Sequence, residues 1–287
     1  MSIQVKDLTY IYMKGTPFEK KALDNVNLQI EDGEIIGIIG HTGSGKSTLV
    51  QHFNGLLKPT SGSVFIDGAD ISIKGSEAIR RRVGLVFQYP EHQLFEESVY
   101  KDIAFGLQKR GILKEESHSR VIEALRAVGL GEEILDKSPF ELSGGQKRRV
   151  AIAGILVLEP SVLVLDEPTA GLDPKGRDEI FSLIKGLHRD KGMTVILVSH
   201  SMEDIAENVD RVLVMNSGKI QIDGSARTVF ENTEMLESIG LSAPQITYLM
   251  KGLKHLMPEI NEKVFTVREA KEELKKYLKK SWGDNSK

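Results

Sequence analysis

Three short, uninterrupted apolar runs indicate the centre of the fold. The runs Glu34–Ile39, Val162–Leu165 and Thr194–Val198 are rich in β-branched residues and lack polar alternation. This pattern is typical of strands that are buried on both faces of a parallel sheet. Because a turn or helix signal follows each run, the chain is predicted to contain repeated strand–helix units in an α/β fold.

Other segments alternate apolar and polar residues, as antiparallel strands with one exposed face do. The predicted antiparallel strands are Ile3–Thr9, Ala22–Ile30 and Ser63–Ile66. Two further runs, Val212–Met215 and Lys219–Ile222, flank Asn216-Ser217-Gly218 and predict a hairpin near the end of the sheet. Helical periodicity appears in five segments, namely Lys46–Gly55, Glu115–Val128, Gly145–Leu158, Lys175–Arg189 and Met202–Asn208.

The pattern changes after Gly224, which divides the chain into a predicted main domain, 1–224, and a helical C-terminal extension, 225–287. The extension is predicted to form short helices at Arg227–Ile239, Pro244–Leu256 and Thr266–Lys280, packed on the main domain. Thr266 and Glu269 have the spacing of a capping box at the start of the last helix.

Composition narrows the function classes. The 287 residues carry a formal net charge of −3, which disfavours nucleic acid as the main partner, and the absence of cysteine excludes disulfides and thiolate metal sites. The longest apolar run, Val150–Leu158, has nine residues, whereas a membrane span needs about 20. Any membrane role is therefore expected to act through a partner.

The first predicted buried strand leads into a phosphate-binding loop. The segment Gly40-His41-Thr42-Gly43-Ser44-Gly45-Lys46-Ser47-Thr48 satisfies G-x-x-x-x-G-K-[ST] between a strand and a helix. Its glycines let backbone N–H groups and the helix N-terminus face phosphate oxygens. We expect Lys46 to reach the β- and γ-phosphates and Ser47 to bind Mg²⁺, while His41 occupies a variable position.

A second acidic site follows another buried strand. Asp166 and Glu167 end the run that starts at Val162. Beside a phosphate loop, Asp166 is predicted to hold Mg²⁺ through its water shell, and Glu167 to polarise the water that attacks the γ-phosphate.

The stretch Leu142-Ser143-Gly144-Gly145-Gln146 distinguishes this chain among phosphate-loop proteins. Ser143 and Gln146 can form a capping box, but that role does not require two consecutive glycines. Gly144 and Gly145 leave the helix N-terminus bare, so a second phosphate can approach its amides. Since one chain cannot easily bring this surface to its own phosphate loop, we expect Ser143, Gly144, Gly145 and Gln146 to bind ATP from a second subunit.

Residues 3–224 resemble the ATP-binding cassette (ABC) ATPases, because they carry these motifs in the order that is typical of that family. The resemblance implies a mixed sheet core with an antiparallel β subdomain and a helical subdomain at about 89–160, with ATP and Mg²⁺ as cofactors. It also implies that Gln88 contacts Mg²⁺ and senses the γ-phosphate, and that His200 grips the γ-phosphate. Tyr12 resembles the aromatic residue that stacks on adenine, with Phe18 as a rival.

Within that family, Val86–Phe95, the loop Gly15–Lys21 and the helical tail are similar to energy-coupling factor ATPases. This resemblance implies an ATP-hydrolysing subunit that drives uptake of vitamins or transition-metal ions. The implied partners are a second ATPase subunit, in a heterodimer or homodimer, a transmembrane scaffold and a substrate-binding membrane subunit, and the implied location is the cytoplasmic face of the cell membrane. The transported substrate stays open.

Two alternatives come from other classes. One is a soluble ABC-type ATPase that acts on nucleic acid or ribosomes, although the chain lacks the coiled coils and zinc-binding cysteines of such relatives. The other is a small-molecule kinase, which would leave Leu142–Gln146 and His200 without roles.

The surface after Gln88 is predicted to dock the membrane partner. Tyr89, Pro90, Leu94 and Phe95 place apolar side chains on a loop, and exposed apolar patches usually mark partner sites. The alternative is that Leu94 and Phe95 fold onto the core beneath a helix around Asp102–Leu107.

Overall fold

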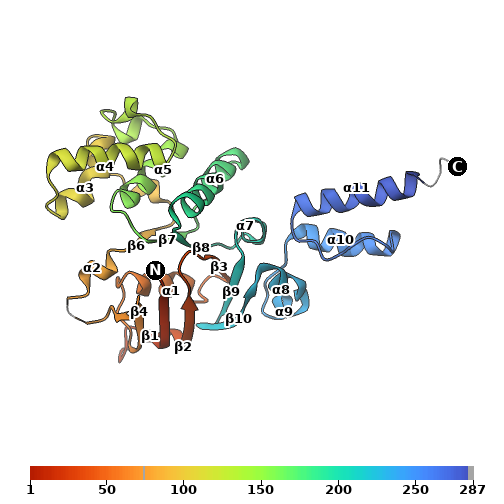
Figure 1. Ribbon diagram of the computed structural model, residues 1–287. Helices are drawn as coiled ribbons and strands as arrows, with labels where there is room; N and C mark the ends of the chain where they lie inside the picture. The colour runs from red at the N-terminus through yellow and green to blue at the C-terminus, as the bar shows by residue number, and fades with distance from the viewer. Residues whose placement is uncertain (74, 284–287) are drawn as a thin grey trace.

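A six-stranded sheet forms the centre of the computed structural model, which describes residues 1–73 and 75–283 (Figure 1). Its strand order is β10-β9-β3-β8-β7-β6, and every neighbouring pair is parallel except β10 with β9. The strands are β3 (Ile35–Gly40), β6 (Val83–Val86), β7 (Val162–Asp166), β8 (Thr194–Val198), β9 (Arg211–Asn216) and β10 (Lys219–Ser225). The three predicted buried strands, β3, β8 and β7, are adjacent and fully buried, which confirms the α/β prediction.

A second, antiparallel sheet packs against the first. Its order is β2-β1-β4-β5, with strands β1 (Ile3–Tyr12), β2 (Lys20–Ile30), β4 (Ser61–Ile66) and β5 (Ala69–Asp70). One hydrophobic cluster joins side chains of both sheets, such as Ile3 and Ile30 with Ile38 and Val198, to Phe53 of helix α1 (Lys46–Phe53). The predicted alternating strands are confirmed, because their buried positions face this shared core.

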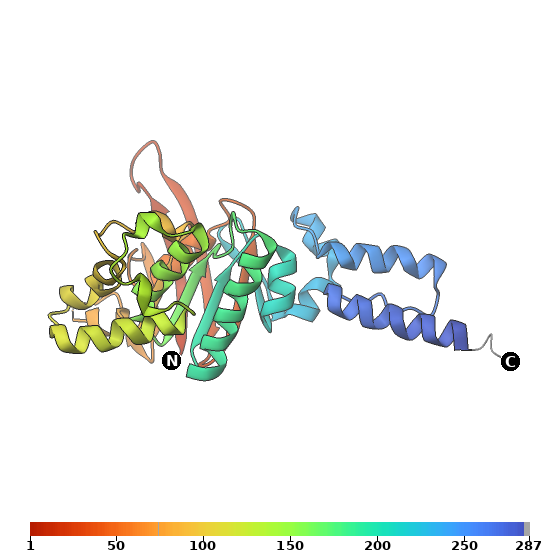
Figure 2. The ribbon, with the colours of Figure 1, turned by 90° about the horizontal axis from the view of Figure 1, so that it is seen from above.

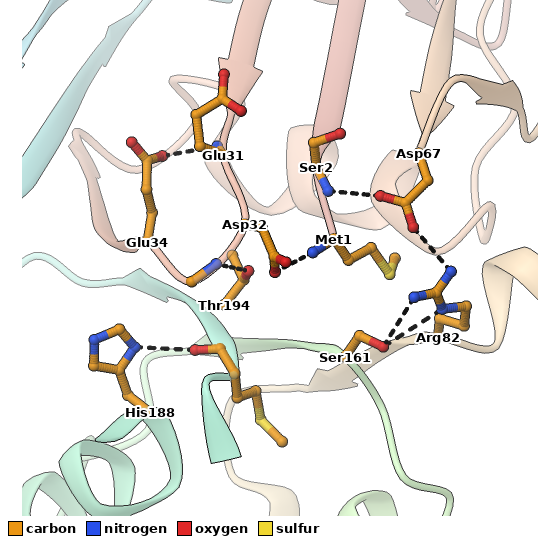
Figure 3. Close-up of polar contacts among 12 residues, drawn as sticks. Met1, Ser2, Glu31, Asp32, Glu34, Asp67, Arg82, Ser161, His188 and Thr194 are labelled. Atoms are coloured by element: carbon orange, nitrogen blue, oxygen red, sulfur yellow. Dashed lines mark hydrogen bonds and ion pairs between the residues drawn. The ribbon is translucent and has the colours of Figure 1, made fainter. Parts of the chain in front are cut away.

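Polar contacts fasten the two sheets where the parallel strands begin (Figure 3). The Asp67 carboxylate accepts from the Ser2 N–H at 2.8 Å and pairs with the Arg82 guanidinium at 2.8 Å. The Thr194 hydroxyl accepts from the Gly33 N–H at 2.9 Å. These contacts hold the amino ends of the strands and leave the opposite edge free for a ligand.

Helices between β6 and β7 gather at one end of the molecule (Figures 1 and 2). They include α3 (Val99–Lys109), α4 (Lys114–Ala127), α5 (Gly144–Leu156) and the 3₁₀ helices η1 (Pro90–Gln93), η2 (Glu132–Ile134) and η3 (Pro139–Glu141). The other helices before residue 225 are α2 (Glu77–Arg80), α6 (Pro174–Lys191) and α7 (Met202–Asn208). The sequence suggested α3 only as a helix around 102–107. The helix begins earlier, at Val99, because the Ser98 side chain caps it by accepting from the Lys101 N–H.

The C-terminal extension lies at the opposite end and differs from its prediction in two ways (Figures 1 and 2). Its helices are α8 (Ala226–Glu231), α9 (Thr233–Ser238), α10 (Gln245–Leu256) and α11 (Val267–Gly283). The single helix predicted at Arg227–Ile239 is two, because Asn232 leaves helical geometry and its side chain caps α9. Only the first part packs closely on the sheet, since α10 and α11 project outwards around their own cluster of Met250, Ile260, Val264 and Ala270.

The predicted capping box of the last helix forms only in part. The Glu269 N–H donates to the Thr266 hydroxyl at 3.1 Å, but the Glu269 carboxylate accepts from Phe265 instead of Thr266. Among the described residues, no helix combines the length and apolar character that a membrane crossing requires.

Candidate functional site

Most of the predicted site residues meet in one hollow of about 370 Å³ at the carboxyl ends of β3, β7 and β8. We call it the nucleotide hollow. It is lined by Tyr12, Lys20, Ala22, Thr42, Gly43, Gly45, Lys46, Ser47, Thr48, Gln88, Asp166, Glu167 and His200. Parallel strands point their carboxyl ends to one sheet edge, so residues that are far apart in sequence converge there.

The phosphate loop has a shape that only glycine permits at two positions. Gly40 has φ 152° and Gly45 has φ 104°. A Cβ would lie 2.3 Å from the Met215 carbonyl oxygen at Gly40, and 2.7 Å from the Ala22 carbonyl oxygen at Gly45. No side chain caps α1, whose N-terminus therefore presents free amides to an anion.

One orphan polar atom in this loop fits a bound phosphate. The Ser44 hydroxyl oxygen is buried and has no hydrogen-bond partner among the described residues. A buried hydroxyl without a partner is costly. A nucleotide phosphate on the loop would offer it an acceptor.

Lys46 places a desolvated ammonium beside the loop. Its Nζ donates to the carbonyl oxygens of Gly40 at 2.6 Å and His41 at 2.9 Å. Burial lowers the pKa of Lys46, and the nearby Glu167 and Asp166 carboxylates oppose that shift. Phosphate oxygens would supply the negative charge that this buried ammonium lacks.

The donor set around Asp166 suits a hard divalent cation. Asp166 is buried next to the Ser47 hydroxyl, and Gln88 lines the same hollow. Across residues 1–73 and 75–283, no group of three or more His, Cys, Asp or Glu side chains could hold a metal ion. A cation here would therefore be completed by phosphate oxygens and water, the arrangement that Mg²⁺ favours.

Glu167 and His200 form a pair at the mouth of the hollow. The His200 Nδ1 lies 2.7 Å from Glu167 Oε1. Glu167 has φ 53°, in the left-handed region that non-glycine residues rarely adopt, and such conformations cluster at functional sites. The pKa of Glu167 is raised, because the effect of burial exceeds the opposing effect of the hydrogen bond to His200. Together the pair can polarise a water molecule.

The structure separates the two candidate adenine-stacking residues. Tyr12 lines the nucleotide hollow, and its hydroxyl lies 3.2 Å from the Thr48 hydroxyl. Phe18 is 78% exposed and does not line the hollow. The geometry therefore supports Tyr12.

Replacing Tyr12 with alanine should raise the KM for ATP about tenfold, because stacking a base on an aromatic ring contributes about 1–3 kcal/mol. Phe18→Ala is the matched control and should leave the KM unchanged. Steady-state kinetics of both variants tests the assignment, which fails if Phe18→Ala gives the larger effect.

The segment Ser143–Gln146 stands apart from the hollow. Its predicted capping box is present, with the Ser143 side chain and the Gln146 side chain each bonding the other's backbone N–H. A Cβ at Gly144 or Gly145 would meet no described atom within 4 Å, so this helix start is open. None of the four residues lines the hollow of its own chain, and their binding of ATP in a second subunit stays a prediction.

Two residues that line the hollow, Lys20 and Ala22, carry no sequence signal. Lys20 and Ala22 line the hollow because the pairing of β2 with β1 brings them there.

The His41 imidazole faces outwards from the loop and contacts the Ile239 carbonyl oxygen in the extension. His41 is therefore a loop residue outside the hollow, and Gly40 and Ser44 also belong to the loop without lining the hollow.

The predicted docking surface divides into buried and exposed parts. Pro90 and Leu94 are buried, with Leu94 in the main hydrophobic core. Tyr89 and Phe95 are exposed, and Phe95 packs edge-on against Phe105. The prediction of four exposed side chains is thus wrong for Pro90, which is buried in η1, and for Leu94, which packs in the core with residues of α3 as the alternative expected.

Single substitutions should separate these roles. Leu94→Ser should cost about 2–5 kcal/mol of unfolding free energy, since it removes a large core side chain. Phe95→Ser should leave the melting temperature nearly unchanged and weaken binding to a membrane scaffold. Thermal melts and co-purification measure the two effects; equal destabilisation by both substitutions would contradict this division.

Asp166→Asn should stabilise the ligand-free protein at neutral pH in the absence of Mg²⁺. Burial raises the pKa of Asp166, so its charged form penalises folding above that pKa. The penalty disappears as pH falls through the raised folded pKa towards the ordinary value of about 3.9. The gain in melting temperature should therefore shrink between neutral pH and pH 4; a variant less stable than wild type at pH 7 would refute the argument.

The comparisons with known proteins agree with this geometry. Residues 23–170 match the ABC transporter family model. The energy-coupling factor transporter ATP-binding protein EcfA2 of Acetivibrio thermocellus is 69% identical over 98% of this chain and 100% of its own length. EcfA2 of Clostridium tetani is 60% identical over 96% of this chain and 97% of its own length.

Two solved structures share the fold. The cbiO1 protein of Clostridium perfringens, described as part of the ABC transporter complex cbiONQ, superposes with a TM-score of 0.73 at 41% identity, over 87% of this chain and 98% of its own. A dimeric, post-hydrolysis ATP-binding cassette, MJ0796 with ADP and Pi, gives a TM-score of 0.69 at 33% identity, over 78% and 98%. Given these matches and the motifs assembled in the nucleotide hollow, the chain belongs to the ABC transporter family and, within it, to the energy-coupling factor transporter ATP-binding proteins.

Proposed function

We propose that this chain is the ATP-hydrolysing subunit of an energy-coupling factor importer and that it drives uptake of vitamins or transition-metal ions. The observation that carries the proposal is the meeting of Lys46, Asp166, Glu167 and His200 in one hollow. These groups provide a phosphate-binding ammonium, a cation ligand and a base with its partner. The alternative of a nucleic-acid or ribosome ATPase finds no support in the relatives.

Each side chain has a distinct task in the proposed hydrolysis. Loop amides and Lys46 bind the β- and γ-phosphates, and Tyr12 stacks on adenine. Ser47, Gln88 and Asp166 would hold Mg²⁺, which neutralises phosphate charge when bound. Glu167 takes a proton from the attacking water, and His200, at 2.7 Å from it, orients that carboxylate and faces the γ-phosphate.

The open helix start at Ser143–Gln146 supports a dimeric active unit. We propose that these residues bind the γ-phosphate of ATP held by a second ATPase subunit, in a heterodimer or a homodimer. ATP then bridges two chains, and hydrolysis releases the closed state. The related MJ0796 cassette is described as dimeric.

The remaining proposals concern partners and organisation. Main-domain residues 1–224, including the helical subdomain at about 89–160, carry the nucleotide chemistry, and residues 225–287 form the extension. We place the chain at the cytoplasmic face of the cell membrane, bound to a transmembrane scaffold and a substrate-binding membrane subunit. The exposed Tyr89 and Phe95 rings offer the scaffold an apolar docking surface.

Co-expression with a membrane scaffold and a sister ATPase subunit tests this function. The chain should move to the membrane fraction with the scaffold, and the purified complex should hydrolyse ATP. Expression without the scaffold is the control and should leave the chain outside the membrane fraction. A chain that ignores the scaffold, while it hydrolyses ATP, would refute the transport role.

A further inference from the structure

A fully buried arginine lies between the nucleotide hollow and the docking surface. Arg148 on α5 is 1% exposed. Its Nε and Nη2 donate to the two Glu91 carboxylate oxygens at 3.0 and 2.6 Å. Its Nη1 donates to the carbonyl oxygens of Pro168 and Ala170, each at 2.9 Å. A charge buried this deeply is tolerated only with such complete pairing.

These contacts join three segments that the proposed mechanism uses separately. Glu91 lies in η1, between Gln88 and the exposed Phe95. Arg148 lies in the first turns of the helix that begins at Ser143–Gln146. Pro168 directly follows Glu167 in the chain, and Ala170 comes two residues later. A shift in any one segment must therefore move the other two or break a buried ion pair.

A second contact reinforces the link between η1 and the segment after Glu167. A Cβ built at Gly171 would lie 3.7 Å from the Tyr89 ring, so that ring reaches the segment that follows Glu167. Tyr89 also adopts a left-handed conformation, with φ 53°, as Glu167 does. Both unusual backbone positions are adjacent to segments that Arg148 holds.

We propose that Arg148 is a positioning residue for ATP hydrolysis, which with Glu91 couples the docking segment 89–95 to the backbone that carries Glu167. Movement of a scaffold against Tyr89 and Phe95 is transmitted through Glu91 and Arg148 to Pro168 and Ala170. The open helix start at Ser143 moves with them, because Arg148 belongs to the same rigid helix. This inference rests on the proposed function.

Arginine is the side chain that this task requires. Its planar fork can bond a carboxylate with two N–H groups while a third nitrogen donates to two carbonyl oxygens. Lysine has one nitrogen and cannot span both sets of acceptors. Burial raises the pKa of Glu91, but the Arg148 hydrogen bond and charge prevail and leave it lowered, so the pair is ionic at neutral pH.

The experiment compares Arg148→Lys and Glu91→Gln in the assembled transporter complex, each alone and combined. Arg110→Lys is the matched control, because Arg110 also donates to a backbone carbonyl, that of Leu158, within the helical region. For each variant we would measure the melting temperature, the KM for ATP and kcat per folded complex, and compare kcat with that of the paired ATPase subunits without the scaffold.

Arg148→Lys should lower kcat about tenfold or more, because small displacements of a catalytic group are costly, while the KM for ATP changes less than about twofold. Glu91→Gln should reduce the stimulation of ATP hydrolysis by the scaffold. The combined variant should be no slower than Arg148→Lys alone, since both substitutions disrupt the same Arg148–Glu91 ion pair. Arg110→Lys should keep the wild-type kcat. If Arg148→Lys does not fold, the scaffold response of Glu91→Gln decides the question.

Two results would overturn the proposal. The first is a wild-type kcat per folded complex in Arg148→Lys, with only the melting temperature reduced. The second is a wild-type scaffold response in Glu91→Gln. Failure of the proposed function is distinguishable, because the wild-type complex itself would then show no scaffold-dependent ATP hydrolysis.

Discussion

Glu167→Gln should bind ATP normally and hydrolyse it at least about a hundredfold more slowly than wild type, because a positioned general base contributes about 10²–10⁴ in rate. Glutamine preserves the size of the side chain and can still contact His200. It cannot accept the proton of the attacking water. ATP should therefore persist in the site and hold two subunits together.

Single-turnover hydrolysis and light scattering with the sister subunit measure the two consequences. Glu207→Gln, on the exposed side of α7, is the matched control and should hydrolyse ATP at the wild-type rate. Undiminished turnover in Glu167→Gln would assign the activation of water to another group. A monomeric Glu167→Gln protein in ATP and Mg²⁺ would contradict the bridging role of the nucleotide.

Lys46→Ala should weaken ATP binding about tenfold to a hundredfold or more, since a hydrogen bond to a charged group contributes about 1.5–3 kcal/mol. The substitution should not unfold the protein. Burial lowers the pKa of Lys46, which means that the ligand-free fold already bears a cost for this ammonium. Removing the side chain relieves that cost.

Equilibrium binding of Mg-ATP, with melting temperatures recorded in parallel, tests this expectation. Lys191→Ala is the control, because Lys191 is exposed at the end of α6 and does not line the nucleotide hollow. Near-normal affinity in Lys46→Ala would remove the phosphate-site assignment. A large loss of affinity in Lys191→Ala would show that general charge, and not one contact, binds the nucleotide.

The fold was predictable where the signal was local. The runs that became β3, β7 and β8 are apolar on both faces, so any other placement would expose them to water. The phosphate loop was equally clear, because Gly40 and Gly45 occupy positions that a Cβ would block. Lys46, Ser47, Asp166 and Glu167 followed from these two signals. Tyr12, Gln88 and His200 followed from the resemblance to ABC ATPases, and Lys20 and Ala22 had no signal.

Features that depend on tertiary packing were not predictable. Leu94 and Phe95 are adjacent and both apolar, yet the extended chain after η1 buries Leu94 in the core and leaves Phe95 59% exposed. The break between α8 and α9 depends on one cap at Asn232. No local pattern marks Arg148, because it is one of three consecutive basic residues, Lys147–Arg149, and its partner Glu91 lies 57 positions away.

The most direct test of the central claim is substrate uptake by proteoliposomes that contain the complete complex, with the ligand that co-purifies with it as the labelled substrate. Uptake should require ATP on the side that this chain faces, and it should stop when this chain carries Glu167→Gln. Equal uptake with and without ATP, by a complex that hydrolyses ATP, would contradict the account.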